Sequence, residues 1–358
     1  RAANAYVLLG FHGYKMIWPR TLSIDWAYNQ PPVFDLAWSV LLAVVLLAAW
    51  VGVGWLLRKR SATALFAVHP LCSEAVLWIV GRSEMLAALL GMSAFILYVK
   101  LSRRPGYGGW RLALSALLLF LALLSKESAA AWIGIGIVWT WLYRRELAAA
   151  WPVRVVHGCV YLGSLLLFLL LRGSAVGWAT KAPFFIDNPL VAADGPARVA
   201  NAFVLLGFYG YKMIWPRTLS IDWAYNQLPV FDLAWSVLLA VVLLAAWVGV
   251  VWLLRKRSAT ALFLWIAIAA GFAVTGNVLV TIGTTFAERL AYLPLTFACG
   301  LAGYGLSRLP WNRTSKIAAV MIVVLLAGFR TGIRTTDFRS STALYEATEL
   351  AAPRAVKS

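Results

Sequence analysis

Charged residues and cysteines are scarce in this chain. Only 13% of its 358 residues are charged, whereas 62% are hydrophobic and the mean hydropathy is +0.79. A water-soluble domain could not bury so much apolar surface, so the composition excludes that class and predicts a polytopic membrane protein. The three cysteines, Cys72, Cys159 and Cys299, are far apart, with no Cys-x-x-Cys pair. This spacing indicates neither a structural zinc site nor a disulfide framework.

Acidic residues are also few, with 14 Asp and Glu against 32 Lys and Arg. Such an excess of basic residues would suggest nucleic acid as the partner of a soluble protein. Here the basic residues form short runs at the ends of apolar segments, as at 58–60 directly after the apolar segment 36–57. This is the pattern that sets the orientation of membrane helices, which carry more Lys and Arg on the cytoplasmic side. We therefore expect membrane lipids and no nucleic acid as partners.

The start of the chain is a near-exact copy of a later block. Residues 1–66 recur at 198–263 with five differences: Ala2/Val199, Tyr6/Phe203, His12/Tyr209, Pro31/Leu228 and Gly54/Val251. Repeats that are kept for architecture drift much further apart than this. We interpret the copy as a recent duplication or a chimeric start, consistent with the absence of a signal peptide at Arg1. A structural tandem array is the alternative, but unrelated sequence separates the two copies.

The apolar segments predict an all-α fold, a transmembrane helical bundle of about ten spans plus two interfacial helices. Pro70 should kink or break the second span. The predicted spans are 36–57, 62–81, 83–101, 111–125, 128–143, 153–172, 233–254, 259–276, 288–306 and 315–331.

Charge placement distinguishes crossing helices from interfacial ones. If 198–216 crossed the membrane, helix 233–254 would deliver the basic run 255–257 to the outer side, although its copy at 58–60 lies inside. We therefore expect 198–216, and equally 2–18, to lie at the outer interface. The domain organisation that follows is a duplicated block at 1–66, a transmembrane domain at 62–331 and an outer tail at 332–358.

This layout places most acids, with matching basic residues, at one membrane face. An ionisable side chain at membrane depth costs about 3 kcal/mol even on the mild insertion scale, so such groups usually mark a functional site. A single residue of this kind could equally be an ordinary loop charge between two spans. The group comprises His69, Glu74, Arg82, Glu84, Lys126, Glu127, Asp187, Asp222, Glu288 and Arg289.

Four sequence blocks carry a resemblance to a known family. Residues 66–76 read Phe-Ala-Val-His-Pro-Leu-Cys-Ser-Glu-Ala-Val and 79–84 read Ile-Val-Gly-Arg-Ser-Glu; a Lys-Glu turn follows at 124–128. Residues 215–229 contain Pro-Arg-Thr-Leu-Ser-Ile-Asp-Trp-Ala-Tyr, and 286–294 read Phe-Ala-Glu-Arg-Leu-Ala-Tyr-Leu-Pro. In this order the blocks resemble the transmembrane O-mannosyltransferases that carry tetratricopeptide repeats, and their bacterial relatives. Each block alone is a weak signal.

The resemblance implies a GT-C type glycosyltransferase that transfers a sugar from a polyprenyl-phosphate carrier to a protein or glycan acceptor at the outer face. An inverting mechanism would use a carboxylate as general base and basic residues to hold the lipid phosphate. No cofactor or metal site is indicated by the motifs, and a metal requirement stays open. By resemblance the candidate catalytic acids are Glu74, Glu127, Asp222 and Glu288, and the candidate substrate-binding residues are His69, Arg82, Glu84, Lys126, Arg289 and Tyr292. Packing is the alternative role for His69 and Tyr292.

One departure from the family concerns its presumed catalytic acid. The family places that acid in the first external loop, ahead of the His-Pro block, where this chain has the duplicated block. The acids before His69 are Asp25 and Asp35, copies of Asp222 and Asp232. The resemblance therefore implies binding of a lipid-linked sugar more firmly than its turnover.

The C-terminal tail and the amino-acid composition suggest a neighbouring domain type and a cellular location. Residues 335–354 resemble the lead-in to tetratricopeptide repeats, with Pro353 after a helix. Richness in Ala, Leu and Arg favours a bacterial inner membrane with the site facing the periplasm. A transporter or flippase of lipid-linked sugars is the alternative function, and a noncatalytic membrane scaffold is another.

Overall fold

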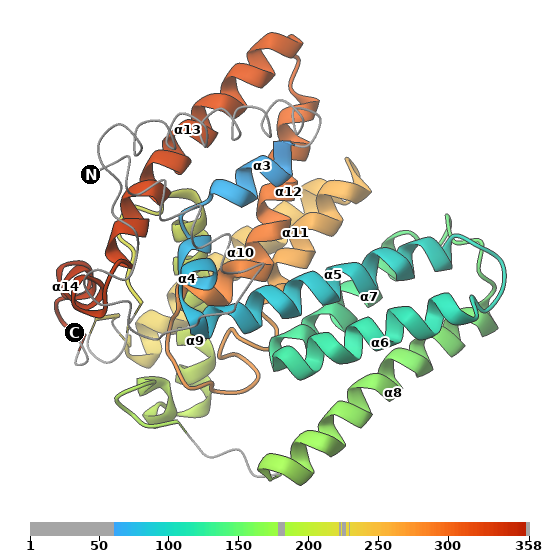
Figure 1. Ribbon diagram of the computed structural model, residues 1–358, viewed down its shortest axis with the longest axis horizontal. Coiled ribbons are helices and arrows are strands. Elements are labelled where there is room, and N and C mark those ends of the chain that lie inside the picture. The colour runs from blue at the N-terminus through green and yellow to red at the C-terminus, as the bar shows by residue number, and fades with distance from the viewer. Residues whose placement is uncertain (1–60, 178–182, 222, 224–226, 229, 356–358) are drawn as a thin grey trace, which may run out of the picture.

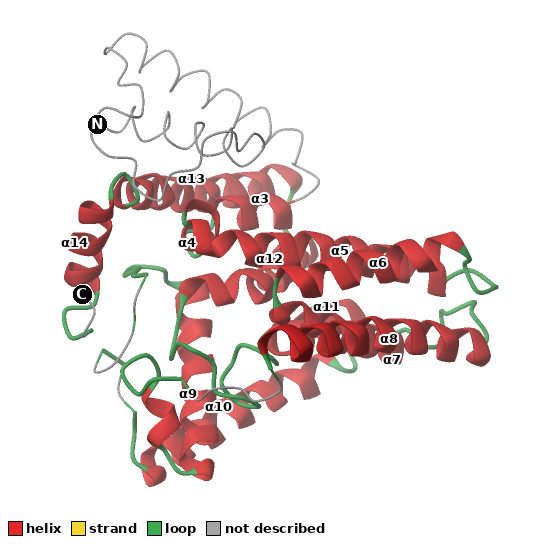
Figure 2. Cartoon of the chain, turned by 60° about the horizontal axis from the view of Figure 1, so that its bottom comes forward, coloured by secondary structure: helices red, strands yellow, loops and turns green. Residues whose placement is uncertain are grey.

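The part of the chain with a described structure is entirely helical. The computed structural model describes residues 61–177, 183–221, 223, 227–228 and 230–355, which contain helices and loops but no strand. The all-α class is therefore confirmed (Figure 2). The predicted span at 36–57, the interfacial helix at 2–18 and the first copy up to residue 60 lie outside the described residues.

Each apolar segment predicted within the described residues forms helix at about the expected place (Figure 1). The α-helices are α3 (Ser61–Val68), α4 (Cys72–Leu77), α5 (Arg82–Ser102), α6 (Trp110–Ser125), α7 (Ala131–Leu142), α8 (Trp151–Val176), α9 (Gly195–Ile214), α10 (Leu233–Leu254), α11 (Ala259–Gly271), α12 (Tyr292–Arg308), α13 (Arg313–Asp337) and α14 (Ser341–Ala351). The short 3-10 helices are η2 (Ile79–Gly81), η3 (Glu127–Ala130), η4 (Pro189–Ala192) and η5 (Glu288–Ala291).

Several of these helices have the length and composition of membrane spans. Among the described residues, five are long and apolar enough to cross a bilayer: α5, α8, α10, α13, and η5 together with α12. A span needs about 20 apolar residues. Helix α10 leaves Leu238 and Val241 more than half exposed, as expected of a helix that faces lipid. The chain is thus an integral membrane protein, and the count of ten crossings stays a prediction.

The predicted span 62–81 is broken at the proline. Helix α3 ends at Val68, α4 has six residues, and Pro70 lies in the turn between them. The break expected at Pro70 is confirmed, because proline lacks the N–H that a continuing helix requires. Neither piece approaches the roughly 30 Å of a bilayer core at 1.5 Å per residue.

Two apolar clusters hold the helices together. The first lies among α5, α6, α7, α11 and α12, where Phe95 stacks on Phe263 with ring centroids 6.0 Å apart. Helix α5 can approach α7 closely because Gly91 has no side chain; a Cβ there would lie 2.1 Å from the Trp132 ring. Figure 1 shows α5 to α8 as one group on one side of the molecule, with α14 on the other.

The second cluster positions the polar residues described below. It joins α4, α9, η5 and α12, with Tyr209 stacked on Phe286 at a centroid distance of 4.0 Å. The Tyr209 hydroxyl donates to the Ala287 carbonyl and accepts from the Ala287 N–H, both at 3.1 Å. Since Ala287 precedes η5, this pairing fixes where η5 begins.

Candidate active site

A buried ion pair joins two segments that are far apart in the chain, α4 and η5. Glu74 on α4 is fully buried, and its two carboxylate oxygens accept from Arg289 on η5, Oε1 from Nη1 at 2.5 Å and Oε2 from the main-chain N–H at 2.9 Å. The Arg289 guanidinium also lies over the Trp78 ring, 5.4 Å from its centroid. Burial raises the pKa of Glu74, and Arg289 opposes that rise by stabilising the carboxylate. Both acceptor oxygens of Glu74 are therefore occupied.

Local backbone packing determines where Glu74 points. Trp78 ends α4 by donating its N–H to the Glu74 carbonyl at 3.2 Å, and Gly81 follows in η2. A Cβ on Gly81 would lie 2.5 Å from the Ala75 Cα and 2.7 Å from the Glu74 carbonyl oxygen. Only glycine at position 81 permits this tight return into α5, and the return keeps Glu74 facing η5.

Glu288 lies beside this ion pair on the same 3-10 turn. Its Oε1 accepts from the Ser220 N–H at 2.8 Å and from Trp223 Nε1 at 3.3 Å. Its Oε2 is buried and accepts no hydrogen bond within the described part of the chain. Glu288 therefore anchors the segment that follows α9 while one carboxylate oxygen stays available.

Lys212 supplies a buried cation next to that segment. Its Nζ donates to the hydroxyl of Thr218 at 2.6 Å and to the Thr218 carbonyl, and lies 4.3 Å from the centroid of the Trp223 ring. The residue is 1% exposed. Lys212 lies on α9, outside the five candidate spans. Burial lowers its pKa, since desolvation disfavours the ammonium, and the carboxylate of Glu288 opposes the change.

The last turns of α13 bring a further basic group to this region. Arg334 is 1% exposed and donates from Nη1 to Asp337 at 2.8 Å, while its Nε and Nη2 have no partner in the described structure. One turn earlier, Arg330 donates to the Arg217 carbonyl at 2.9 Å, and Thr331 donates to the Val68 carbonyl at 2.7 Å. These bonds attach α13 both to the segment after α9 and to the His-Pro turn.

A second ion pair lies at the start of α5. Glu84 is buried; Lys126 Nζ lies 2.9 Å from its Oε1, and the Ser128 hydroxyl donates to its Oε2 at 2.8 Å. Glu127 points elsewhere, 56% exposed, and accepts from Arg172 Nε at 3.2 Å. Although partial burial raises the pKa of Glu127, hydrogen bonds from its own backbone and from Arg172 bring it below the usual value.

The remaining predicted residues lie outside these two ion pairs and differ in what they contact. His69 donates from Nε2 to the Met213 carbonyl at 3.0 Å and accepts from the Leu71 N–H at Nδ1. Tyr292 packs edge-on against Phe66, with centroids 5.0 Å apart. Arg82 Nε is buried without a partner in the described structure. Asp222 lies outside the described residues, and no group of three or more metal-ligating side chains occurs among those described.

The structure thus separates the predicted residues into two sets. Glu74, Arg289 and Glu288 meet at η5. Glu84, Lys126 and Glu127 meet around the start of α5, which follows α4 after Trp78 and the three residues of η2. Sequence reasoning assigned Lys212 to an interfacial helix and gave Arg334 no role. The only sequence signal for either is a basic residue within an otherwise apolar helix.

Several known proteins that are similar in sequence to this chain are named protein O-mannosyl-transferases. The chain is 26% identical over 341 residues to protein O-mannosyl-transferase Tmtc3 of Drosophila melanogaster, and 29% identical over 325 residues to protein O-mannosyl-transferase TMTC4 of Homo sapiens. Protein O-mannosyl-transferase TMTC3 of Homo sapiens is 25% identical over 315 residues. Each match covers 79% of this chain but 36%, 43% and 34% of the relative, respectively.

The chain spans about two fifths or less of the length of these relatives. No protein-family model matches it, and no solved structure does. The resemblance to O-mannosyltransferases that the four blocks predicted is confirmed: over about four fifths of its length, the chain is similar to proteins named protein O-mannosyl-transferases.

Proposed function

We propose that this chain is a mannosyltransferase-like enzyme that moves a sugar from a polyprenyl-phosphate carrier to an acceptor hydroxyl at the outer face of the membrane. In this reaction the acceptor oxygen attacks the anomeric carbon, and the bond from that carbon to the phosphate oxygen breaks. The hydroxyl proton passes to a carboxylate, and polyprenyl phosphate leaves with the bonding electron pair. Richness in Ala, Leu and Arg supports a bacterial inner membrane as the location, although the relatives named above are animal proteins.

The observation that carries the proposal is the buried cluster of acids and bases at η5. Glu74, Glu288, Arg289, Lys212 and Arg334 come from four separate helical segments. Buried charges are costly, and a protein that needed only stability could replace the pairs with apolar residues at little or no cost. Such a cluster in a membrane protein points to a charged substrate.

Basic residues of this cluster would hold the lipid phosphate. Arg289 was a candidate from sequence, and the structure adds Arg334 and Lys212 beside the same turn. The Arg334 side chain is 1% exposed, so like Lys212 it would act on the phosphate through its charge, whereas the Arg289 side chain is 17% exposed and can contact a phosphate oxygen. A cation aimed at the departing phosphate stabilises the negative charge that develops there.

The general base must be a carboxylate that an acceptor can reach. Glu74 is fully buried and both of its oxygens are bonded to Arg289. Glu288 is also fully buried. Among the predicted acids that the structure describes, Glu127 is the most exposed, and it is paired with Arg172 as a carboxylate. We therefore assign the proton-accepting role to Glu127.

The test is transfer of radiolabelled mannose from polyprenyl phosphate by the purified chain in detergent, with a peptide rich in Ser and Thr as the acceptor. Glu127→Gln should lower kcat about 100-fold with unchanged donor binding. Arg289→Lys should weaken donor binding, because the lysine ammonium cannot bind a phosphate through two parallel N–H groups as the planar guanidinium does. Glu349→Gln, an exposed change on α14, is the matched control.

Three outcomes would count against the proposal. Transfer that is equal in Glu127→Gln and the unmodified chain would remove Glu127 from the mechanism. Absence of both transfer and donor binding in a folded chain would refute the enzyme assignment. Movement of lipid-linked sugar across proteoliposomes without a glycosylated product would favour the flippase alternative.

A further inference from the structure

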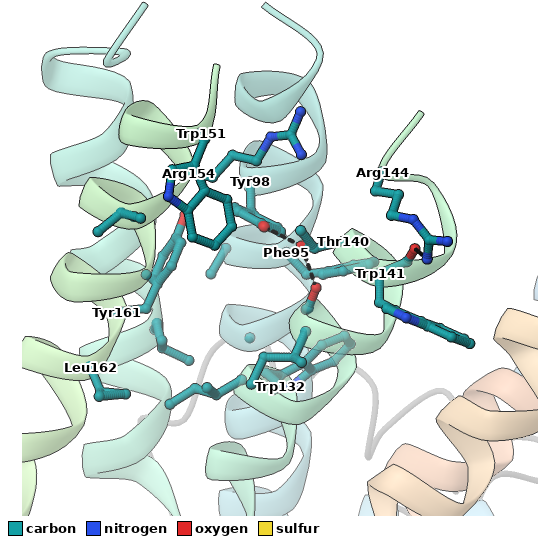
Figure 3. A pocket seen from close by; sticks show the side chains of 18 residues that line it. Phe95, Tyr98, Trp132, Thr140, Trp141, Arg144, Trp151, Arg154, Tyr161 and Leu162 are labelled. Atoms are coloured by element: carbon teal, nitrogen blue, oxygen red, sulfur yellow. Dashed lines mark hydrogen bonds between the residues drawn. The ribbon is translucent and has the colours of Figure 1, made fainter. Parts of the chain in front are cut away.

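A second region of interest lies away from the candidate active site. A cavity of about 440 Å³ opens between α5, α7 and α8, with Leu119 of α6 in its wall (Figure 3). Its volume is in the range of small-molecule and lipid sites. None of the residues of the Glu74–Arg289 and Glu84–Lys126 pairs lines it. The cavity therefore requires its own explanation.

Most of the cavity wall is apolar and aromatic. Phe95, Trp132 and Leu162 line it, and the glycines at 136 and 158 widen it because they carry no side chain. A Cβ built on Gly158 meets no atom within 4 Å, which shows that space is open on that side of α8.

The polar groups in the wall are occupied by one another. The Tyr98 hydroxyl pairs with the Thr140 hydroxyl, which donates to the Gly136 carbonyl at 2.7 Å. The Tyr161 hydroxyl lies 2.8 Å from that of Ser115. An apolar occupant would therefore leave none of these hydroxyls without a partner.

Two arginines lie at one end of the cavity. Figure 3 shows Arg154 beside Trp151 and Arg144 beside Trp141, both at the end opposite Trp132 and Leu162. Arg154 donates from Nε to the Ala149 carbonyl at 2.7 Å, and Arg144 donates from Nη1 to the Trp141 carbonyl at 3.1 Å.

These bonds hold each guanidinium by one nitrogen. The terminal nitrogens of Arg154 and Nη2 of Arg144 make no hydrogen bond in the described part of the chain, so they are available to a ligand. Among the residues that line the cavity, none is acidic.

The surroundings add to the positive charge. Lys100 lies in the last turn of α5, and Arg103 and Arg104 follow the helix. The Arg103 guanidinium lies 5.7 Å from the centroid of the Trp139 ring. Arg145 follows in the turn after α7, and the single acid of that turn, Glu146, is exposed. Tryptophan and arginine together at the end of apolar helices are typical of the membrane interface.

We propose that this cavity binds an anionic glycerophospholipid. Its phosphate would contact Arg144 and Arg154, and one acyl chain would fill the apolar interior toward Trp132. Basic pockets between membrane helices recognise anionic headgroups, and each further Lys or Arg near the surface strengthens that attraction. The proposal does not depend on the transferase assignment, because lipid binding is measured without a sugar or an acceptor.

The test is native mass spectrometry of the full chain in detergent, with phosphatidylglycerol, phosphatidylcholine of the same acyl chains and polyprenyl phosphate in equal amounts. The unmodified chain should retain one phosphatidylglycerol with at least about tenfold preference over phosphatidylcholine. The double variant Arg144→Gln/Arg154→Gln should lose that preference. Gly158→Phe should lower the retention of both phospholipids by filling the cavity.

Basic and glycine positions outside the cavity provide the controls. Arg308→Gln/Arg313→Gln and Gly305→Phe, exposed changes away from this cavity, should leave retention unchanged. Equal retention of the two phospholipids, unchanged binding in both cavity variants, or preference for polyprenyl phosphate over phosphatidylglycerol would each overturn the proposal. Glycerol phosphate that displaced the lipid completely at equal concentration would also overturn it, because the acyl chain would then contribute nothing.

Discussion

Glu74 and Arg289 are 215 positions apart in the chain and are joined by two hydrogen bonds, one to the arginine side chain and one to its main-chain N–H. The main-chain bond means that Glu74 holds the backbone of η5 as well as the guanidinium. The turn after the His-Pro break and the turn that begins α12 are therefore fixed together, and Glu288 is placed by the same contact.

Loss of Arg289 should destabilise the protein strongly. Arg289→Ala leaves Glu74 buried without its cation, and removing one partner of a buried pair costs about 3–5 kcal/mol. Thermal unfolding in detergent should show a large loss for Arg289→Ala and a smaller one for Glu74→Leu/Arg289→Met. Arg172→Ala, which breaks the exposed pair with Glu127, should cost about 1 kcal/mol or less. Equal losses for the buried and exposed pairs would contradict the packing described here.

Gly81 should tolerate no side chain. In Gly81→Ala the new methyl group meets backbone atoms of Ala75 and Glu74 at 2.5–2.7 Å, so α4 must move. We expect a marked fall in thermal stability and loss of donor binding. Gly134→Ala on α7 is the control, since a Cβ there meets nothing within 4 Å, and alanine there should be neutral or stabilising. A Gly81→Ala protein that matched the Gly134→Ala protein would show that α4 is not held as described.

His69 should make stability depend on pH. Burial lowers its pKa from the usual 6.5, and the hydrogen bond to the Met213 carbonyl only partly opposes this. Because the folded-state pKa lies below the unfolded one, the stabilisation is fully present above pH 6.5 and declines as pH falls toward the folded-state pKa. His69→Gln should reduce the slope of thermal stability between pH 6.5 and 5. An unchanged slope in that variant would assign the pH dependence to other groups.

Lys212 should limit donor binding at alkaline pH. Its lowered pKa means that the ammonium of the folded protein loses its charge at a lower pH than an ordinary lysine. Binding of polyprenyl phosphate should therefore weaken as pH rises through this lowered pKa. Lys212→Arg should extend binding to higher pH, and Lys212→Met should weaken it at all pH values. If Lys212→Met bound the donor with the original pH profile, the charge of Lys212 would not contribute to phosphate binding.

The sequence predicted the helices well because apolar runs are long and their ends are marked by charge. It predicted the break at Pro70 from the chemistry of proline alone. The acids and bases of η5 and α4 were found by their motifs. The pairing of Glu74 with Arg289 rather than with Arg82 depends on how α4 packs on η5, which no local pattern encodes.

Arg334 could not be identified from sequence for a related reason. It lies at the end of an apolar helix, where basic residues ordinarily meet water or lipid headgroups. Its burial results from α13 packing beside the His-Pro turn, through the bond from Thr331 to Val68. Lys212 was placed only within a helix predicted to lie at the outer interface, and the Thr218 and Trp223 groups around it come from an irregular segment without periodicity.

The end of the described chain is tethered to the same irregular segment. Ala352 is buried in the second apolar cluster, and the Arg354 N–H donates to the Gln227 side chain at 3.0 Å, four residues beyond Trp223. A partner that bound the chain after α14 could therefore displace the segment that follows α9, which is bonded to Glu288. Such a displacement would alter the region where the sugar phosphate is proposed to lie.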